Sequence, residues 1–260
     1  MIAAALLLLL SSSPVDHYNR ANSLFSQGQF DQAGKEVDAA LAGDPKLVPA
    51  LTLKGKLAMA LNRFDIARVC LESAARLEPN SPYVQFLLGF FHYVDNDFAK
   101  SIPVLERARA LNPNDVRTHF YLALSYEGVA DPEKARALYE RTIELEKRLN
   151  KPSPDTHVAF GRLLFTLGEY ESSSRQIGRA LELDPQSRDG HYETGRLHFE
   201  RKAYEEAAAA GERALKLAGA GTTDRQIHFL LARCYRKLGK IELAEAHFAR
   251  FQASGVSLRR

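Results

Sequence analysis

Small, apolar and helix-breaking residues recur along this chain at one fixed spacing. Pro45, Pro79 and Pro113 stand 34 residues apart, and proline ends helices because it lacks an amide hydrogen and its ring clashes with the preceding turn. If these prolines are placed at position 32 of a 34-residue period, seven repeats fit between Pro14 and Leu258, with four extra residues before the fifth repeat and three before the seventh. The repeats begin at Pro14, Val48, Pro82, Val116, Pro154, Arg188 and Arg225.

Positions that were not used to set this register follow it as well. Position 8 is Gly or Ala in every repeat, and position 20 is Ala or Ser. A turn such as Gln27-Gly28-Gln29 lies between them, and two small residues on either side of a turn let two helices approach closely. Each repeat is therefore predicted to be an antiparallel hairpin of helix A and helix B. Position 27, which is mostly alanine, is where the next repeat is expected to pack.

The chain resembles a tetratricopeptide repeat protein in its small position 8, its alanine at position 20 and its proline at position 32. This resemblance covers nearly the whole chain and implies an all-α fold, a right-handed α-solenoid of antiparallel helix hairpins. Repeat four lacks the proline, and Gly211 stands at the usually bulky position 24 of repeat six. Residues 132–150 are predicted to form one long helix B that two prolines end. The array then divides into residues 14–153, with repeats one to four, and residues 154–258, with repeats five to seven.

Residues 1–13 begin with an apolar run, Ile2 to Leu10, followed by three serines. The run resembles the core of a signal peptide, and it is too short to span a bilayer, which takes about 20 residues. We therefore predict an exported protein, periplasmic or secreted, without a stable membrane span. The alternative is a cytoplasmic protein in which this segment packs on the first helix.

Charge and motifs exclude several classes of function. The 35 basic and 32 acidic residues leave a net charge of +3, too balanced for a dedicated nucleic-acid binder. The sequence has no G-x-S-x-G, H-E-x-x-H or C-x-x-C motif, so no catalytic residue, cofactor or enzymatic activity is predicted. Cys70 and Cys234 lie more than four repeats apart, too far for a disulfide, and are expected to be buried thiols.

Five repeats carry histidine at position 4, where the family has a large residue. Histidine is a common metal ligand, but equivalent helices of neighbouring repeats lie about 8–10 Å apart, and zinc needs its nitrogen ligands at about 2 Å. We therefore predict no metal site and expect the imidazoles to form hydrogen bonds across their hairpins. The five residues are His17, His119, His157, His191 and His228.

A second stripe on helix A is the candidate binding surface. If positions 4, 8 and 11 face the hairpin interior, positions 2, 5, 9 and 12 form the adjacent stripe, which lines the concave groove in tetratricopeptide repeat proteins. In this chain the stripe is aromatic in repeats three and four and carries arginine at position 9 in repeats five to seven. The predicted groove residues are Tyr83, Phe86, Phe90, Tyr93, Arg117, Phe120, Tyr121, Arg162, Arg196, Arg233 and Arg236.

Both halves of this surface have a second interpretation. The aromatic residues can equally pack against neighbouring helices, and Arg196 has Glu193 and Glu200 at helical spacing for an ordinary ion pair. Arg162 and Arg233 have no carboxylate three or four residues away, so they are the stronger candidates for contact with a ligand.

We predict a non-catalytic adaptor or scaffold whose groove binds a protein or peptide with acidic and apolar groups. The alternative is a structural assembly component that docks through its C-terminal end, by self-association or within a membrane complex, while the groove is passive. Phe248 and Phe251 motivate that alternative. Binding of RNA or glycans through the arginines is a third class, which the balanced charge disfavours. The carboxylate-binding set of some family members is not reproduced: Asn22 matches one of its positions, but Tyr18 replaces its lysine and Leu53 one asparagine.

Overall fold

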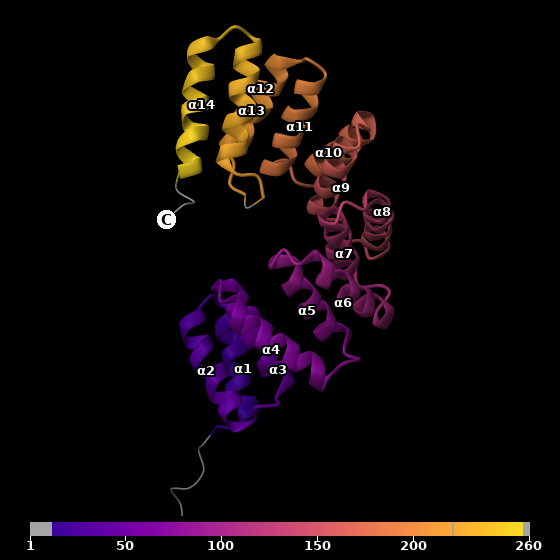
Figure 1. Ribbon diagram of the computed structural model, residues 1–260, viewed down its shortest axis with the longest axis vertical. Helices are drawn as coiled ribbons and strands as arrows, with labels where there is room; N and C mark the ends of the chain where they lie inside the picture. The colour runs from indigo at the N-terminus through magenta and orange to yellow at the C-terminus, as the bar shows by residue number, and fades with distance from the viewer. Residues whose placement is uncertain (1–11, 220, 257–260) are drawn as a thin grey trace, which may run out of the picture. The chain divides into compact units, whose positions relative to one another are not determined.

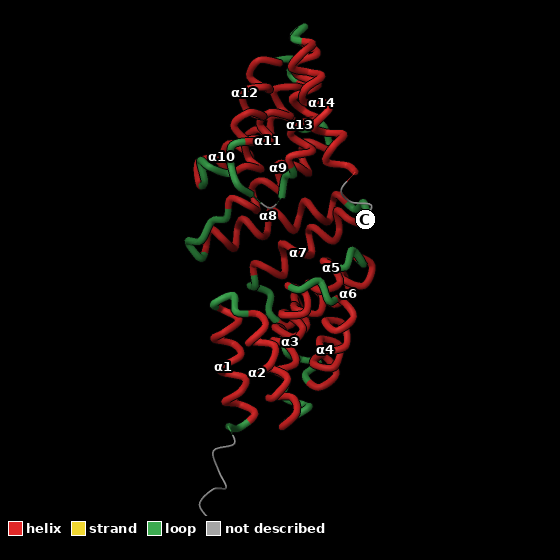
Figure 2. Tube along the Cα trace, turned by 90° about the vertical axis from the view of Figure 1, so that its left-hand side faces the viewer, coloured by secondary structure: helices red, strands yellow, loops and turns green. Residues whose placement is uncertain are grey.

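The computed structural model describes residues 12–219 and 221–256, and within these ranges it contains fourteen α-helices and no β-strand (Figure 2). Helix A of the successive repeats is α1 (Pro14–Ser26), α3 (Val48–Ala60), α5 (Pro82–Val94), α7 (Val116–Gly128), α9 (Pro154–Thr166), α11 (Arg188–Glu200) and α13 (Asp224–Lys237). Helix B is α2 (Phe30–Gly43), α4 (Phe64–Leu77), α6 (Phe98–Leu111), α8 (Pro132–Arg148), α10 (Tyr170–Leu183), α12 (Tyr204–Leu215) and α14 (Ile241–Val256). The all-α prediction is confirmed, and helix A of every repeat begins within one residue of its predicted start.

Consecutive helices pack as hairpins, as the pair α13 and α14 shows clearly in Figure 1. The chain divides into two compact units, Met1–Ala135 and Arg136–Arg260, which we call the N-terminal and C-terminal units and describe separately. The junction falls within α8. The predicted grouping into residues 14–153 and 154–258 stays a prediction. Residues 1–11 of the predicted export signal lie outside the described residues, while Ser13 caps the start of α1.

A left-handed residue at position 15 reverses the chain between helix A and helix B in every repeat. The backbone N–H of the following residue then closes the turn with a hydrogen bond. In repeat one, for example, the Gln29 N–H donates to the Leu24 carbonyl at 2.9 Å. Glycine and asparagine adopt positive φ readily, whereas other residues lose about 1–2 kcal/mol there. The residues, with φ between 56° and 79°, are Gly28, Asn62, Asn96, Ala130, Gly168, Lys202 and Gly239.

The small residues at positions 8 and 20 hold each hairpin closed. A Cβ added to Gly89 would lie 2.6 Å from the side chain of Leu105 on the facing helix, so glycine is needed for this approach. Where position 20 is serine its hydroxyl donates to the carbonyl at position 8: Ser101 to Gly89 at 2.9 Å and Ser173 to Gly161 at 2.7 Å. The two helices therefore approach so closely at these positions that a short side chain of helix B reaches the backbone of helix A.

Repeat six is filled differently, because its position 24 is Gly211. Cβ atoms added to Gly195 and Gly211 would each lie 2.9 Å from a leucine of the next repeat, Leu230 and Leu231 respectively. Both leucines are buried. The space that a bulky position 24 fills elsewhere is thus filled by α13.

One buried carboxylate ties the end of α8 to the start of α9. Glu146 accepts hydrogen bonds from the Thr156 hydroxyl at 2.6 Å and from the Ser153 amide at 3.2 Å. Burial raises the pKa of Glu146, and the two hydrogen bonds oppose that rise. This contact orders the linker of repeat four, where the position-32 proline is missing.

The residue at position 27 packs against helix A of the next repeat, as predicted. Ala74 shares a buried cluster with Val84 of the following helix A, and Ala214 shares one with Ile227. In the last repeat this position is Phe251, a half-buried aromatic ring in place of a methyl group.

Candidate peptide-binding surfaces

In the N-terminal unit, α5 and α7 bring five aromatic side chains together. The Tyr121 ring centroid lies 4.6 Å from that of Phe90, 5.3 Å from that of Tyr93 and 6.0 Å from that of Phe86. Phe120 lies 5.4 Å from Tyr121 on the same helix. Phe86 is buried and the other four are half-buried. This aromatic cluster packs repeats three and four together, and its predicted role in binding stays a prediction.

Tyr83 and Arg117 lie at the edge of the aromatic cluster. The Tyr83 side chain is 42% exposed. The Arg117 guanidinium lies 4.6 Å from the centroid of the Phe86 ring, and its Nε lies 3.4 Å from a carboxylate oxygen of Asp115. These residues line a small pocket of about 90 Å³. The exposed ring and the cation are the parts of this region that a ligand can reach.

In the C-terminal unit, arginine side chains stand over aromatic rings of the preceding repeat. The Arg196 guanidinium lies 4.0 Å from the centroid of the Phe165 ring, and that of Arg233 lies 4.1 Å from the Phe199 ring. Such contacts favour a cation over a ring face and fix its position. Position 9 thus meets position 12 of the repeat before it. We call the four predicted residues the arginine face: Arg162, Arg196, Arg233 and Arg236.

A buried carboxylate lies beneath this face. Glu193 is only 5% exposed, and Nη1 of Arg196 lies 2.7 Å from its Oε2, so the predicted ion pair is confirmed. Burial raises the pKa of Glu193, while the charges of Arg196 and Arg162 act in the opposite direction. Arg162 therefore also interacts electrostatically with the Glu193 carboxylate. Because Glu193 belongs to the next repeat, residue spacing along one helix could not predict this interaction. These residues and Tyr192 line a pocket of about 330 Å³.

His17, His157 and His228, all at position 4, make the predicted contact across their hairpins. Nδ1 of His17 lies 2.7 Å from the Glu36 carboxylate, and Nδ1 of His157 lies 2.7 Å from the Gln176 side-chain oxygen. Nδ1 of His228 lies 2.9 Å from Nδ1 of another histidine, His247. Each partner stands nineteen residues further along, at position 23. His119 and His191 each contact a backbone carbonyl, at 3.0 Å.

The last repeat exposes aromatic side chains on its final hairpin. The Phe251 ring centroid lies 5.0 Å from that of Phe229 and 5.7 Å from that of Phe248. Phe229 and Phe248 are 42% and 36% exposed. The Arg225 guanidinium lies 4.5 Å from the centroid of the Phe251 ring. We call Phe229, Phe248 and Phe251 the terminal aromatic patch.

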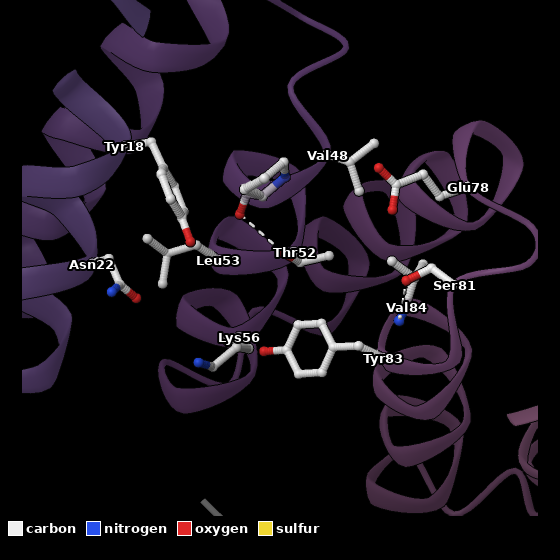
Figure 3. Close-up of a pocket in the computed structure, with 11 residues that line it drawn as sticks. Tyr18, Asn22, Val48, Thr52, Leu53, Lys56, Glu78, Ser81, Tyr83 and Val84 are labelled. Carbon is white, nitrogen blue, oxygen red and sulfur yellow. Dashed lines mark hydrogen bonds between the residues drawn. The ribbon is translucent and has the colours of Figure 1, made fainter. Parts of the chain in front are cut away.

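A pocket of about 240 Å³ in the N-terminal unit contains residues that were not predicted (Figure 3). Tyr18 and Asn22 reach it from α1, Lys56 from α3 and Tyr83 from α5. Only Tyr83 was among the predicted groove residues. The others stand at positions 5 and 9 of repeats one and two, so the same stripe, followed toward the N-terminus, was the signal that could have found them.

Within the described ranges, no helix has both the length and the apolar character needed to cross a bilayer. The same residues contain no group of three or more His, Cys, Asp or Glu side chains placed to hold a metal ion. Cys70 and Cys234 are buried thiols, as expected. Burial raises the pKa of Cys234 to about 11, so this thiol is not an activated nucleophile.

Comparison with known families matches the repeat along most of the chain. Three sequence models described as tetratricopeptide repeat match residues 24–89, residues 92–154 and 158–222, and residues 226–251. The TPR repeat-containing protein YpiA of Bacillus subtilis (strain 168) is 24% identical over 144 residues, which is 55% of this chain and 33% of that protein. The chain therefore matches only about a third of the length of this relative.

Solved structures share the fold at low sequence identity. A tetratricopeptide repeat protein from Parabacteroides merdae aligns with a TM-score of 0.73 and 14% identity, covering 92% of each chain. PilF of Pseudomonas aeruginosa aligns with a TM-score of 0.67 and 18% identity, covering 78% of this chain and 90% of PilF. At these identities the likeness concerns the arrangement of helices and not the ligand.

Proposed function

The chain belongs to the tetratricopeptide repeat family, whose members generally act as protein–protein interaction scaffolds, and we propose that it is a non-catalytic adaptor that binds a partner through its helix-A surfaces. The proposed partner presents acidic side chains to the arginine face of the C-terminal unit. Apolar side chains of a partner are proposed to contact the exposed edge of the aromatic cluster in the N-terminal unit.

The arrangement of the arginine face is the observation that carries this proposal. Arg196 and Arg233 are held over the rings of Phe165 and Phe199, so they lose little side-chain freedom when an anion binds. Arg162, Arg233 and Arg236 are exposed. Two carboxylates, those of Glu193 and Asp189, line the pocket beside these cations. Four arginines against two carboxylates leave a net positive surface for acidic side chains.

A second candidate is docking through the terminal aromatic patch. Its support is the exposure of Phe229 and Phe248 beside Arg225, because exposed apolar groups framed by charge are typical of interaction sites. Phe251 argues against a further helix packing there as helix A does in the internal repeats, where position 27 is small.

We also propose that the protein is exported, on the apolar run before Ser11. N-terminal sequencing of the protein from its native cell tests this. Removal of the run supports export, and an intact Met1 in the cytoplasm contradicts it.

Titration of variants against a partner captured from the native cell tests the main proposal. Arg162→Ala and Arg233→Ala should each weaken binding by about 1.5 to 3 kcal/mol, as for hydrogen bonds to charged groups. Arg196→Ala should weaken it less, because the Arg196 side chain is half-buried against Glu193 and Phe165, whereas Arg162 and Arg233 are exposed. Arg175→Ala is the matched control, since Arg175 is exposed on the helix-B side and contacts Ser172.

Salt separates the charged surface from the apolar ones. Higher ionic strength should weaken the wild type more than the doubly substituted Arg162→Ala, Arg233→Ala protein, because screening acts only on charges that remain. Tyr83→Ala, at the exposed edge of the aromatic cluster, should lower affinity with little change in salt dependence. If the arginine variants bind as the wild type does and Phe248→Ser does not, the terminal aromatic patch is the binding surface.

A further inference from the structure

We infer that α14 is a self-association surface, on which two copies of this chain pair about a two-fold axis beside Phe248. This surface includes the terminal aromatic patch, so the inference rests on the second candidate function proposed above and names its occupant, a second copy of the chain. No residue of the arginine face takes part. The main proposal and this pairing can therefore fail independently.

The outermost helix of the C-terminal unit is α14 (Figure 1), and it presents the face that an internal helix B turns toward the next repeat. A Cβ added to Gly34, at position 21 of repeat one, would lie 3.5 Å from Leu57 of repeat two. Ala208, at position 21 of repeat six, shares a buried cluster with Ile227 of repeat seven. Positions 24 and 27 meet the next repeat as well. In the last repeat, positions 21, 24 and 27 are Glu245, Phe248 and Phe251.

This face is rich in exposed apolar groups. Phe248 is exposed, and Ile241, which is 53% exposed, precedes it by seven residues and so lies on the same side of the helix. Phe229 and Leu243 are exposed too, so that within the described ranges the last repeat exposes more large apolar side chains than any other repeat. Exposed apolar groups gathered in this way are typical of interaction surfaces.

The same face carries two charges that have no ionic partner within the described ranges. Glu245 is exposed, and its carboxylate forms neither an ion pair nor a hydrogen bond there. Arg225 is also exposed, and its guanidinium lies over the Phe251 ring, 4.5 Å from the ring centroid, without a carboxylate in ion-pairing distance. The surface is therefore acidic on one side of Phe248 and basic on the other.

A two-fold axis beside Phe248 brings these opposite charges together. In the resulting antiparallel pair of helices, the residue three places before Phe248 faces the residue three places after it on the other copy. Glu245 of one copy then faces Phe251 of the other, where Arg225 stands over the ring, and the symmetry forms this pair twice. A parallel pair would instead place each Glu245 beside its own equivalent, which like charges disfavour. Charge therefore selects the antiparallel arrangement.

A second copy suits this face better than a further helix A does. Five of the other repeats have alanine at position 27, where helix A of the next repeat approaches closely, and the Phe251 ring holds an incoming helix further away. Two copies bring rings to both sides of the interface, and aromatic rings pack favourably against each other at such distances. Phe248 and Phe251 already lie 5.7 Å apart between centroids.

The test is sedimentation equilibrium of the full chain from about 1 µM to about 1 mM, which covers Kd values in that range. Glu245→Arg and Arg225→Glu each place like charges across the interface, so each should weaken the dimer at least about tenfold, because two pairs are reversed per dimer. The doubly substituted Glu245→Arg, Arg225→Glu protein has both pairs again with their charges exchanged, and its dimer should be about as strong as that of the wild type. Phe248→Ser should leave a monomer.

Glu242→Arg is the matched control. Glu242 stands on the same helix at position 18, which is exposed in every repeat and lies more than about 100° round the helix from Phe248. The same change of charge there should leave the dimer unchanged. Arg162→Ala should leave it unchanged too, although the main proposal expects that variant to lose affinity for its partner. Circular dichroism checks that every variant keeps its helix content.

A wild-type dimer that Phe248→Ser abolishes and that the double charge exchange restores supports the inference. A wild type that stays monomeric over the whole range, a dimer that persists in Phe248→Ser, or a double variant no tighter than the single ones would overturn it. A monomeric chain whose captured partner is lost in Phe248→Ser would also overturn it, because the terminal aromatic patch would then dock a different protein.

Discussion

Repeat three and repeat six solve the same packing problem in different ways. In repeat three, Leu105 of helix B fills the space beside Gly89, so the hairpin is closed by its own residues. In repeat six the corresponding residue is Gly211, and leucines of α13 fill the space. The space between the two helices is filled from within the hairpin in repeat three and by the next repeat in repeat six. One repeat pattern can therefore close its hairpin with its own side chain or with side chains of its neighbour.

The largest test of this difference removes the filling side chain from each region. Leu105→Ala and Leu230→Ala should each cost about 2–5 kcal/mol, as for other buried leucines. Hydrogen exchange should accelerate mainly in α5 and α6 for the first variant, and across α11, α12 and α13 for the second. If α11 and α12 stay protected in Leu230→Ala, repeat six does not depend on α13.

Adding a methyl group should produce a smaller effect. A Cβ at position 89 would meet both the Leu105 side chain at 2.6 Å and its backbone nitrogen at 3.2 Å, whereas at position 211 it would meet the Leu231 side chain at 2.9 Å. Gly89→Ala should therefore cost about 1–3 kcal/mol by overpacking, and Gly89→Leu should cost more. Gly211→Ala should cost less, because a side chain can move and alanine favours the helix by about 1 kcal/mol. Urea denaturation measures both, and equal costs would contradict the comparison.

Acid should sharpen the comparison further, through the repeat that completes repeat six. Nδ1 of His228 lies 2.9 Å from Nδ1 of His247, and Nε2 of His247 lies 3.3 Å from the Glu212 carboxylate on α12. Burial lowers the pKa of both imidazoles; for His228 the charge of His247 adds to this, while Glu212 opposes it for both. The folded state thus holds fewer protons than the unfolded chain, whose histidines titrate near about 6.5.

The neutral pair therefore stabilises α13 and α14 above about pH 6.5, and this contribution is lost as the pH falls through the lower folded pKa values. Hydrogen exchange in α12, α13 and α14 should accelerate on acidification, and His228→Gln should reduce the change. In repeat three His92 is also buried with a lowered pKa, but it is a single imidazole, so the loss there should be smaller. His157→Gln, at a contact with an amide, is the control.

The smallest expected effect concerns the turn. Position 15 is Asn96 in repeat three and Lys202 in repeat six, both at positive φ. Asparagine tolerates this conformation and lysine does not, so Lys202→Gly should stabilise the protein by about 1 kcal/mol and Asn96→Gly should have almost no effect. Thermal denaturation of the two variants checks this, and an equal gain from both would show that the turn conformation costs the two residues the same.

The repeat made most of the fold predictable, because helix starts, the tight position 8 and the alanine at position 27 each follow from local pattern. The packing of repeat six could not be predicted from its own residues, because the space beside Gly211 is filled by a neighbouring helix. The candidate surfaces were predicted in the same uneven way. Arg196 and Glu193 share a helix and were found by spacing, whereas the influence of Glu193 on Arg162 acts between helices.

Contacts between cations and aromatic rings explain why Lys56 and its neighbours were not predicted. The Lys56–Phe25 contact joins position 9 of one repeat to position 12 of the repeat before, as Arg196 and Arg233 do with their rings. A search for carboxylates along one helix cannot see this pairing. Comparing the same positions across adjacent repeats can, and the His–position 23 pairs could have been found in the same way.

Phe251 matters for anyone who wishes to lengthen this array. A designed repeat appended after α14 needs a packing surface with a residue as small as alanine at position 27. Here the Phe251 ring covers that surface together with Phe229 and Phe248. Grafting should therefore begin with Phe251→Ala, which restores the residue that five of the other repeats carry at this position. This substitution is therefore the first change that we expect such a graft to need, and Phe229 and Phe248 are the next positions to examine.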